Sequence, residues 1–462
     1  MQILPSGAQP ASCLSLAPFR GLRYAQDRVS GIAEVTSPPY DVIAHDTADH
    51  LLASDPHNVV RLILPRHDGG NPARTGAAGP AGTAGAALAN GGAGVTGSGA
   101  AYDDAARLLR DWQDDGILVP DPVPALYVYE QALPGHHVLQ RGLIGALRLA
   151  PLDGGPVLPH EDVIPGPVAG RRQLMEATGA NLEPIFLLYD GKDGSASTAQ
   201  ITGQAMGREP LLAIDTDDGI CHRLWGVTDP AEQAAIAADL GSHQALIADG
   251  HHRYAAYLQL QARKRAAGAG PGPWDAGLAL LVDSTAFPPR IGAIHRLVPG
   301  LRPARAAQLA EPAFTVRALP RATRQQALDA LADAAEANMA FLIAGRDSCY
   351  LLTDPDPGAA RDAMPGRSAR WRALSAAVMQ ELLLGRLWGV TDDDQHVEVH
   401  HDAGEALRAA ARSADRTAVL CPPLPADVVR DVAAHGERVP RKSTSFAPKP
   451  RSGMVLRSFA LG

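Results

Sequence analysis

Short apolar runs alternate with polar, turn-forming stretches along the chain, and they predict a mixture of strands and helices. Strands are expected at 59–64, 125–129, 143–149, 184–189, 245–247, 278–282, 340–343 and 417–420. Helical spacing is expected at 103–114, 171–177, 231–240, from 255 onward, at 325–337 and at 368–384. The strands at 125–129 and 143–149 form a predicted hairpin across Pro134 and Gly135. The pattern therefore predicts an α+β fold.

The order of these elements predicts three regions. Residues 1–150 form an N-terminal α+β region with a strand-rich start, 151–300 a core that holds the chemistry, and 301–462 a helix-rich C-terminal α+β region. Between 71 and 100, nineteen of thirty residues are Gly or Ala, and Arg74 is the only charged residue. Such a tract buries too little apolar surface to offset its ordering entropy, so a disordered insertion is predicted there.

Composition narrows the class of protein. The 462 residues carry a net charge of -8, which argues against a general nucleic-acid or membrane surface. No run of about eighteen apolar residues predicts a membrane span, and the N-terminus lacks the pattern of a signal peptide. The cysteines are scattered, as expected for free thiols of a cytoplasmic protein, at Cys13, Cys221, Cys349 and Cys421.

The most informative stretch is 248–254, Ala-Asp-Gly-His-His-Arg-Tyr. It lies between an apolar strand and an alanine-rich helical pattern, so it delivers polar groups to a helix N-terminus, where backbone N–H groups and the helix dipole attract phosphate. Gly250 permits close backbone approach, and Arg253 can grip phosphate bidentately. The alternative is an Asp N-cap with histidines that face solvent. We interpret the stretch as a phosphate site.

Other segments could contribute to a site. Tyr40 and Asp41 follow two prolines and either line a cleft or form a rigid turn. A basic, hydroxyl-rich loop either clamps a phosphate or acidic substrate or is a solvated tail; it comprises Arg441, Lys442, Ser443, Thr444 and Lys449. The sequence contains no GxxxxGK[ST], no GxGxxG after a strand, no GxSxG and no HExxH.

The strand, Asp-Gly-His-His-Arg and helix resemble the nucleotide motif of the ParB/sulfiredoxin-like superfamily, and more narrowly the archaeal ADP-dependent kinases of free serine. Those kinases have an upstream Pro-His-Glu, matched here by 159–161, then a helix and a Pro-led strand. An insertion at 190–240 departs from their pattern. Over its whole length the chain resembles a bacterial family, domain of unknown function 1015, through 37–43, 158–161, 181–184, 248–254, 442–444 and 448–449.

The kinase resemblance implies roles for individual residues. Glu161 would be the general base, with His160 beside it; the alternatives are a solvated loop acid and a structural hydrogen-bonding histidine. Asp249 would hold Mg²⁺ or orient a histidine. Phosphate and nucleotide contacts would come from Gly250, His251, His252 and Arg253, with further substrate contacts from Tyr40, Asp41, Lys442, Ser443 and Thr444.

The sequence thus predicts a cytoplasmic phosphotransferase. Its cofactors would be Mg²⁺ with ATP or ADP, and its substrate a small hydroxylated metabolite such as serine. The first alternative is a nucleotide-binding, ParB-like regulatory module, and the second is a phosphoester hydrolase in which water replaces the acceptor. Neither a membrane nor a nucleic-acid partner is expected.

Overall fold

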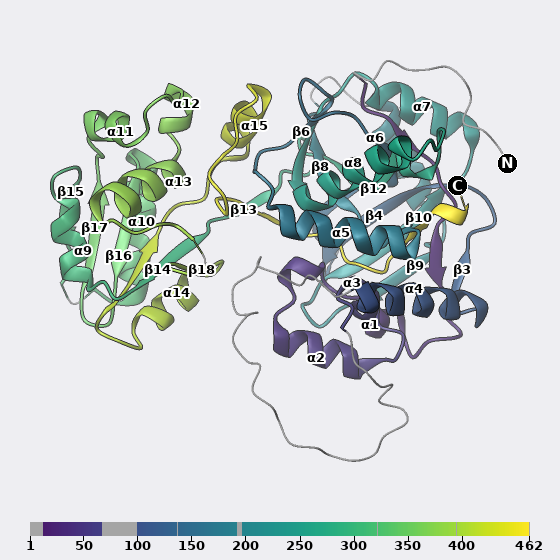
Figure 1. The fold of residues 1–462 in the computed structure, drawn as a ribbon, viewed down its shortest axis with the longest axis horizontal. Coiled ribbons are helices and arrows are strands. Elements are labelled where there is room, and N and C mark those ends of the chain that lie inside the picture. Colours follow the sequence, from purple (N-terminus) through teal and green to yellow (C-terminus); the bar gives the residue numbers. More distant parts are fainter. Residues whose placement is uncertain are drawn as a thin grey trace, which may run out of the picture. The chain divides into compact units, whose positions relative to one another are not determined.

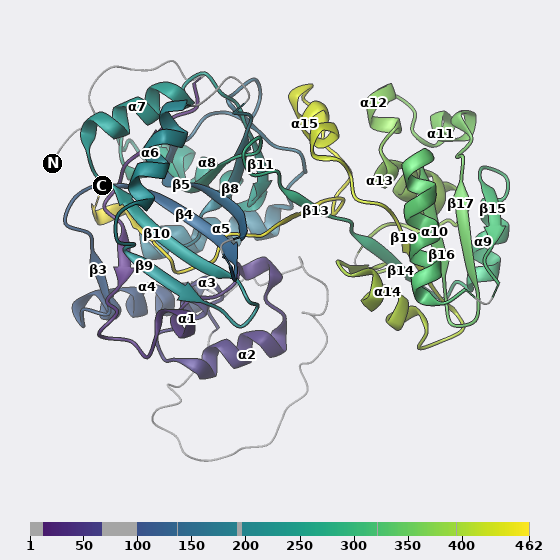
Figure 2. The same cartoon turned by 180° about the vertical axis from the view of Figure 1, so that it is seen from behind.

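The computed structural model describes residues 13–66, 99–135, 137–191, 196–320, 322–393 and 395–461. The chain divides into two compact units. Unit 1 comprises Met1–Pro159, Val163–Pro289 and Pro448–Gly462, and unit 2 comprises His160–Asp162 and Arg290–Ala447. Both units combine helices with a sheet (Figures 1 and 2), so the expected α+β class is confirmed.

Unit 1 is built on a nine-stranded mixed sheet with the order β6-β11-β8-β12-β5-β4-β10-β9, and β1 pairs with β5. The pairs β6–β11 and β8–β12 are parallel, and the others are antiparallel. The strands are β1 (Leu16–Ala17), β4 (Leu126–Leu133), β5 (His137–Arg148), β6 (Val157–Leu158), β8 (Ile185–Tyr189), β9 (Leu212–Asp215), β10 (Cys221–Val227), β11 (Ala245–Asp249) and β12 (Ala276–Asp283). The predicted β4–β5 hairpin is confirmed.

Helices bury one face of this sheet. Every residue of β8 and β11 is buried, as expected for central strands that are covered on both sides. On one face, alternate residues such as Ile185, Leu187 and Ile247 pack against α5 (Pro165–Thr178), α6 (Ala196–Met206), α7 (Pro230–Leu240) and α8 (His251–Ala266). Figure 1 shows α5 beside α8, and the two helices are in contact.

Short elements complete unit 1. The N-terminal part contributes β2 (Leu22–Tyr24), α1 (Ile32–Val35), the 3₁₀ turn η1 (Tyr40–Val42), α2 (His45–Ser54), α3 (Val60–Ile63), α4 (Gly99–Asp114) and β3 (Leu118–Pro120). The C-terminal segment returns to this unit, where β21 (Arg457–Ser458) pairs with β7 (Ala180–Asn181) and Ser452 forms a bridge with Ser37. The 3₁₀ turns η3 (Pro273–Asp275) and η5 (Phe459–Leu461) also belong to unit 1. The end of the chain is therefore part of the fold of unit 1.

Unit 2 is built on a six-stranded antiparallel sheet with the order β15-β17-β16-β19-β14-β18. Its strands are β14 (His295–Pro299), β15 (Thr315–Ala318), β16 (Ala340–Ala344), β17 (Cys349–Thr353), β18 (Glu398–His400) and β19 (Arg416–Leu420). One face packs against α10 (Arg324–Ala337) and α14 (Ala403–Ala410) through Leu297, Leu331 and Leu342 (Figure 2). A separate ribbon pairs β13 (Arg290–Gly292) with β20 (Ser445–Ala447).

Unit 2 contains further helices: α9 (Pro303–Ala310), α11 (Pro357–Ala363), α12 (Ala369–Arg372), α13 (Ser375–Ala377), the π-helical Val378–Leu387 and α15 (Ala426–Ala434). The single helix expected at 368–384 is wrong, because the buried Leu374 takes an extended conformation between α12 and α13. Among the described residues, no helix has both the length and the apolar character needed to cross a bilayer.

The strand expected at 59–64 is also wrong, since Val60–Ile63 forms α3. A short apolar run does not distinguish a buried strand from a buried helical turn. Here the side chain of Asn58 accepts a hydrogen bond from the Val60 N–H (2.9 Å) and starts the turn. The predicted insertion at 71–100 lies outside the described residues, except for Gly99 and Ala100, which begin α4. The three-region division stays a prediction, although strands from both sides of residue 150 share one sheet.

Candidate functional site

The turn between β11 and α8 brings the Asp-Gly-His-His-Arg motif to a helix N-terminus, as predicted from the sequence. Gly250 is the N-cap and has φ +95°, a left-handed conformation that favours glycine. A Cβ atom at this position would lie 2.9 Å from Cγ2 of Ile185. No described side chain caps α8, and its first turn contains no acidic residue. The sixteen-residue helix therefore presents its positive end at this turn.

A buried ion cluster surrounds Asp249. Nη2 of Arg253 is paired with Oδ2 of Asp249, and Nζ of Lys449 lies 2.5 Å from Oδ1 of the same carboxylate. Lys449 also pairs with Asp41, so its ammonium group bridges two aspartates. The Arg253 side chain donates a further hydrogen bond to the Pro184 carbonyl (2.6 Å). Arg253 is thus fixed by protein groups on two sides, and Lys449 is not part of a solvated tail.

A second layer of the cluster holds Tyr40 in place. Oε1 of Glu183 accepts hydrogen bonds from the Tyr40 N–H and from Oγ of Ser452, both at 3.0 Å. The guanidinium of Arg171 lies 4.1 Å from the centre of the Tyr40 ring, and that of Arg253 lies 5.8 Å from it. These cation–π contacts and the Glu183 hydrogen bonds hold the 3₁₀ turn at Tyr40 against the cluster.

The electrostatics of the cluster follow from its burial. Burial alone would raise the pKa of Asp249, but the charges of Lys449 and Arg253 hold it well below its ordinary value. Burial opposes the charge of Lys449, yet Asp249 and Asp41 raise its pKa. Burial raises the pKa of Glu183, and the charges of Arg253 and Arg171 oppose this only in part. Burial also raises the pKa of the Tyr40 hydroxyl to about 12. The ion pairs of Asp249 with Lys449 and Arg253 therefore stay charged around neutral pH.

The two histidines of the motif are both shielded from solvent to a large extent. His251 is buried and begins α8, and the half-buried ring of His252 accepts a hydrogen bond at Nε2 from the Ile164 N–H (3.1 Å). A nitrogen that accepts this bond carries no proton. His252 therefore helps to position the start of α5. That its ring also contacts a bound phosphate stays a prediction.

A second predicted group of residues comes together in unit 2. Nε2 of His160 lies 2.9 Å from Oγ1 of Thr444, and this hydroxyl donates to Oε1 of Glu161 at 3.3 Å. The Val439 N–H donates to the carbonyl of His160 (2.8 Å), which fixes the short His160–Asp162 segment within unit 2. Two segments nearly three hundred residues apart in the sequence thus form one polar group.

The loop that carries Thr444 is held by a buried ion pair that the sequence did not reveal. Nε of Arg296 lies 2.9 Å from Asp392, and its Nη2 and Nη1 donate at 3.2 Å to the carbonyls of Arg441 and Lys442. Lys442 has φ +53°, an uncommon conformation for a residue with a side chain. Oγ of Ser443 donates to the Pro440 carbonyl (2.5 Å). Lys442 and Ser443 therefore shape the loop.

Glu183, Arg171 and Lys449 complete the unit 1 cluster. Glu183 was not among the predicted site residues, and Lys449 was predicted only as a member of the basic loop. Glu183 lies in the 181–184 segment, which the sequence marks only as a family motif. Its position directly before Pro184 and the apolar run 185–188 is the sequence signal that could have found it. Among the described residues, no group of three or more His, Cys, Asp or Glu side chains is arranged to hold a metal ion.

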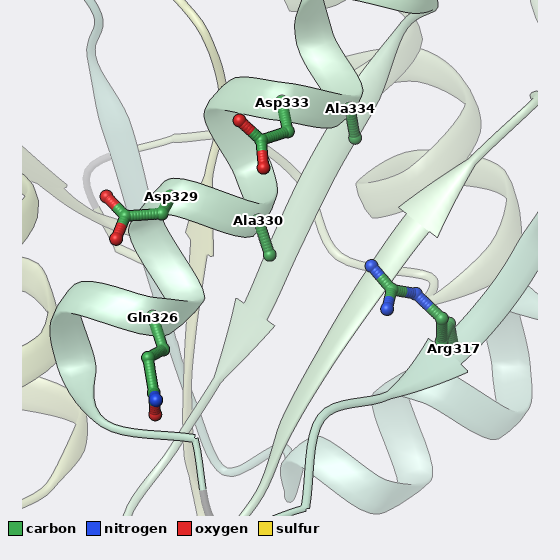
Figure 3. A pocket seen from close by; sticks show the side chains of 6 residues that line it. All are labelled: Arg317, Gln326, Asp329, Ala330, Asp333 and Ala334. Atoms are coloured by element: carbon green, nitrogen blue, oxygen red, sulfur yellow. The ribbon is translucent and has the colours of Figure 1, made fainter.

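A hollow of about 510 Å³ lies elsewhere in unit 2. Figure 3 shows its lining, in which Asp329 and Asp333 extend from α10 and Arg317 extends from β15. The rest of the lining consists of Gln326, Ala330 and Ala334. None of the predicted site residues lines it, and the candidate residues of each unit are those of the cluster described for that unit.

Comparison with known proteins identifies the family. Residues 16–377 match the family described as "Protein of unknown function (DUF1015)". The chain belongs to this family. The resemblance seen in the sequence is thereby confirmed at the level of the family, and no curated protein matches the chain.

Solved structures resemble the chain at low identity. SbnI with a C-terminal truncation, from Staphylococcus aureus, is 14% identical with a TM-score of 0.33, over 66% of this chain and 84% of that one. A free serine kinase in complex with AMP is 13% identical with a TM-score of 0.33, over 66% and 87%. A conserved hypothetical protein from Pyrococcus furiosus is 12% identical with a TM-score of 0.33, over 70% and 97%.

Proposed function

We propose that the chain is a nucleotide-dependent phosphotransferase that acts on a small hydroxylated metabolite such as serine. The turn at Gly250 is the observation that carries this proposal: a long helix begins there without a capping side chain. Its left-handed glycine lets phosphate oxygens approach the backbone N–H groups of the first turn. The likeness of this motif to that of the ParB/sulfiredoxin-like superfamily and the serine kinases supports the same function.

The charges around the turn decide which groups meet the phosphate. The cluster pairs each of its cations with a carboxylate: Arg253 and Lys449 with Asp249, and Arg171 with Glu183 at 3.9 Å. It therefore leaves no surplus cation for a bound phosphate. We assign the compensation of phosphate charge to the positive end of α8 and to His251, with the cluster as a rigid support.

Magnesium does not fit at Asp249 in this arrangement. Both carboxylate oxygens are engaged, one by Arg253 and the other by Lys449. The ammonium group of Lys449 takes the position between Asp41 and Asp249 that a divalent cation would need. The proposed reaction therefore uses no metal ion at these residues.

The likeness of 159–161 to the Pro-His-Glu segment of the serine kinases makes Glu161 the proposed base of the transfer step. Its carboxylate is half-buried and therefore only partly hydrated, as is typical of a general base. The acceptor hydroxyl loses its proton to Glu161, its oxygen forms a bond to phosphorus, and the bond from phosphorus to the leaving nucleotide oxygen breaks. ADP or ATP is the proposed donor, since both end in a phosphoryl group that can be displaced in this way.

Nucleotide binding is tested first, by calorimetric titration of ADP and ATP into the full chain. His251→Gln should weaken binding by about ten- to a hundredfold, as expected for the loss of a hydrogen bond to a charged group, and Arg253→Lys should weaken it through the loss of the contacts that support the turn. Arg263→Lys, in the last turn of the same helix, is the matched control and should bind normally. Unchanged affinity in both His251→Gln and a folded Arg253→Lys would refute the phosphate site.

Turnover is tested with Glu161→Gln. Loss of a general base lowers the rate by about 10²- to 10⁴-fold, while nucleotide affinity should stay within twofold of the wild type. Release of free phosphate without a phosphorylated product would instead identify a hydrolase. Binding without any turnover in the wild type would favour the regulatory module.

A further inference from the structure

One edge of the unit 2 sheet exposes backbone hydrogen-bonding groups. β15 is the terminal strand and pairs, antiparallel, with β17 alone. The Leu319 N–H donates to the Cys349 carbonyl (2.9 Å), so Leu319 is a hydrogen-bonded member of this ladder. Because such members alternate, Arg317 also bonds toward β17, whereas Val316 and Ala318 turn their N–H and C=O groups to the open side. Within the described part of the chain, no hydrogen bond reaches these outward groups.

The hollow of about 510 Å³ borders this edge, because its lining joins Arg317 of β15 to one side of α10 (Figure 3). Its volume falls within the range of about 300–1,000 Å³ that is common for ligand sites. Asp329 accepts a hydrogen bond from Gln325 (2.7 Å), while Arg317 and Asp333 form no ion pair or hydrogen bond with any described residue. The exposed charges of the hollow are therefore available to a ligand and are acidic in sum.

An extended peptide fits both the edge and the hollow. Its main chain would bond to the outward groups of Val316 and Ala318, as a further strand of the sheet. The Arg317 side chain lies on the α10 face, as does that of Leu351 opposite it, so alternate side chains of the peptide would also lie on this face. A carboxylate opposite Arg317 is favoured there, and long basic side chains two positions away can extend toward the acidic side of α10.

A second copy of the chain fits this edge poorly. An antiparallel copy that satisfies all the outward groups pairs Val316 of one chain with Ala318 of the other. This register places Arg317 directly opposite its own copy, in a non-hydrogen-bonded pair whose Cα atoms are about 4.5 Å apart, where like charges repel. Arg317 therefore disfavours self-pairing and favours a strand with a carboxylate at that position.

We propose that β15 and α10 form a docking site for an extended peptide segment of another protein, with a carboxylate opposite Arg317 and basic side chains toward Asp329 and Asp333. The segment adds a strand to β15 and fills the hollow with its side chains. This inference goes beyond the proposed function and does not depend on it, because β15, β17 and α10 belong to unit 2 and carry none of the proposed site residues.

The probe is a fluorescent peptide with the sequence Thr-Lys-Val-Glu-Val-Lys-Thr, whose anisotropy is followed as the full chain is added. Its glutamate can lie opposite Arg317, and its charge pattern reads the same in both directions, so parallel and antiparallel addition are both tested. The matched control peptide has Lys and Glu exchanged. It should bind about tenfold more weakly, because every charge then faces a like charge.

Two variants of the chain test the edge and the hollow separately. Ala318→Pro removes an outward N–H and keeps the ladder to β17, since proline is tolerated on the open side of an edge strand. It should weaken binding about tenfold, whereas Ala318→Ser, which keeps the N–H, should bind as the wild type does. Asp329→Asn combined with Asp333→Asn should weaken binding about three- to tenfold. Urea unfolding verifies that each variant is folded.

Hydrogen exchange at single amides distinguishes strand addition from loose ionic attraction. The peptide should slow exchange at Val316 and Ala318 by about tenfold or more and leave Arg317, which β17 already holds, nearly unchanged. Equal affinity for the charge-exchanged peptide, wild-type affinity in a folded Ala318→Pro, or no binding of the probe would overturn the docking site. Dimerisation of the chain that Ala318→Pro abolishes would make a second copy the occupant and overturn the peptide.

Discussion

Replacement of Lys449 by Met tests the buried ion cluster of unit 1. The change keeps most of the side-chain volume and removes the ammonium group that bridges Asp41 and Asp249. The side chains of Lys449 and Asp249 are only 18% and 10% exposed, and that of Asp41 is 31% exposed. Removing one partner of a buried ion pair costs about 3–5 kcal/mol, and the partial exposure of Asp41 favours the lower end, about 3 kcal/mol.

The pH dependence gives this prediction a sign. The pKa of Asp249 is lowered in the folded chain, so its ion pairs contribute stability above the pKa of an unfolded aspartate, about 3.9, and lose it as the pH falls through the folded value. Lys449→Met removes part of that contribution. The difference in unfolding free energy between Lys449→Met and wild type should therefore be largest at pH 7 and narrow below about pH 4.

The assay is urea unfolding at pH 7 and pH 3.5, with hydrogen exchange of peptides from β11 and α8 to localise the loss to unit 1. Lys264→Met on α8, whose ammonium lies over the Trp274 ring at 5.6 Å, is the matched control and should change stability by less than about 1 kcal/mol. Wild-type stability and unchanged exchange of β11 in Lys449→Met would refute the reasoning.

Three further changes test other parts of the account. Gly250→Ala should cost about 1–3 kcal/mol in urea unfolding, because φ is +95° and the new Cβ would meet Ile185 at 2.9 Å; a neutral change would contradict the strained turn. Asp392→Asn should cost about 3 kcal/mol in the unfolding of unit 2, because Arg296 stays buried without its carboxylate, and wild-type stability would contradict this. Burial lowers the pKa of His222 to about 4, so the unfolding free energy of the wild type should fall as the pH drops from about 6.5 toward that value. His222→Gln should reduce this dependence on pH. An identical dependence in both proteins would count against the role of His222.

The phosphate-site turn could be predicted because its signals are local. An apolar run, a glycine and an alanine-rich pattern follow one another within twenty residues, and the structure places β11, Gly250 and α8 there. The run at 59–64 misled because its apolar residues fit a strand and a buried helical turn equally well. The hydrogen bond from the Val60 N–H to the Asn58 side chain favours the helical turn, and the apolar pattern alone does not include it.

The ion cluster could not be predicted for a different reason. Lys449 and Asp249 are two hundred residues apart in the sequence, and they meet because the C-terminal segment returns to unit 1, where Ser452 bridges Ser37. The partners of a buried charge are set by tertiary packing, which a single sequence does not encode in any short pattern. The contact of Thr444 with His160 and Glu161 depends on the fold of unit 2 in the same way.

Phosphorus NMR of the purified full chain with ADP or ATP and a pool of hydroxylated metabolites tests the central claim most directly. The proposed function predicts a new phosphomonoester resonance that is lost in Glu161→Gln and retained in Arg263→Lys. Free phosphate as the sole product, or nucleotide resonances that stay unchanged throughout, would contradict a phosphotransferase.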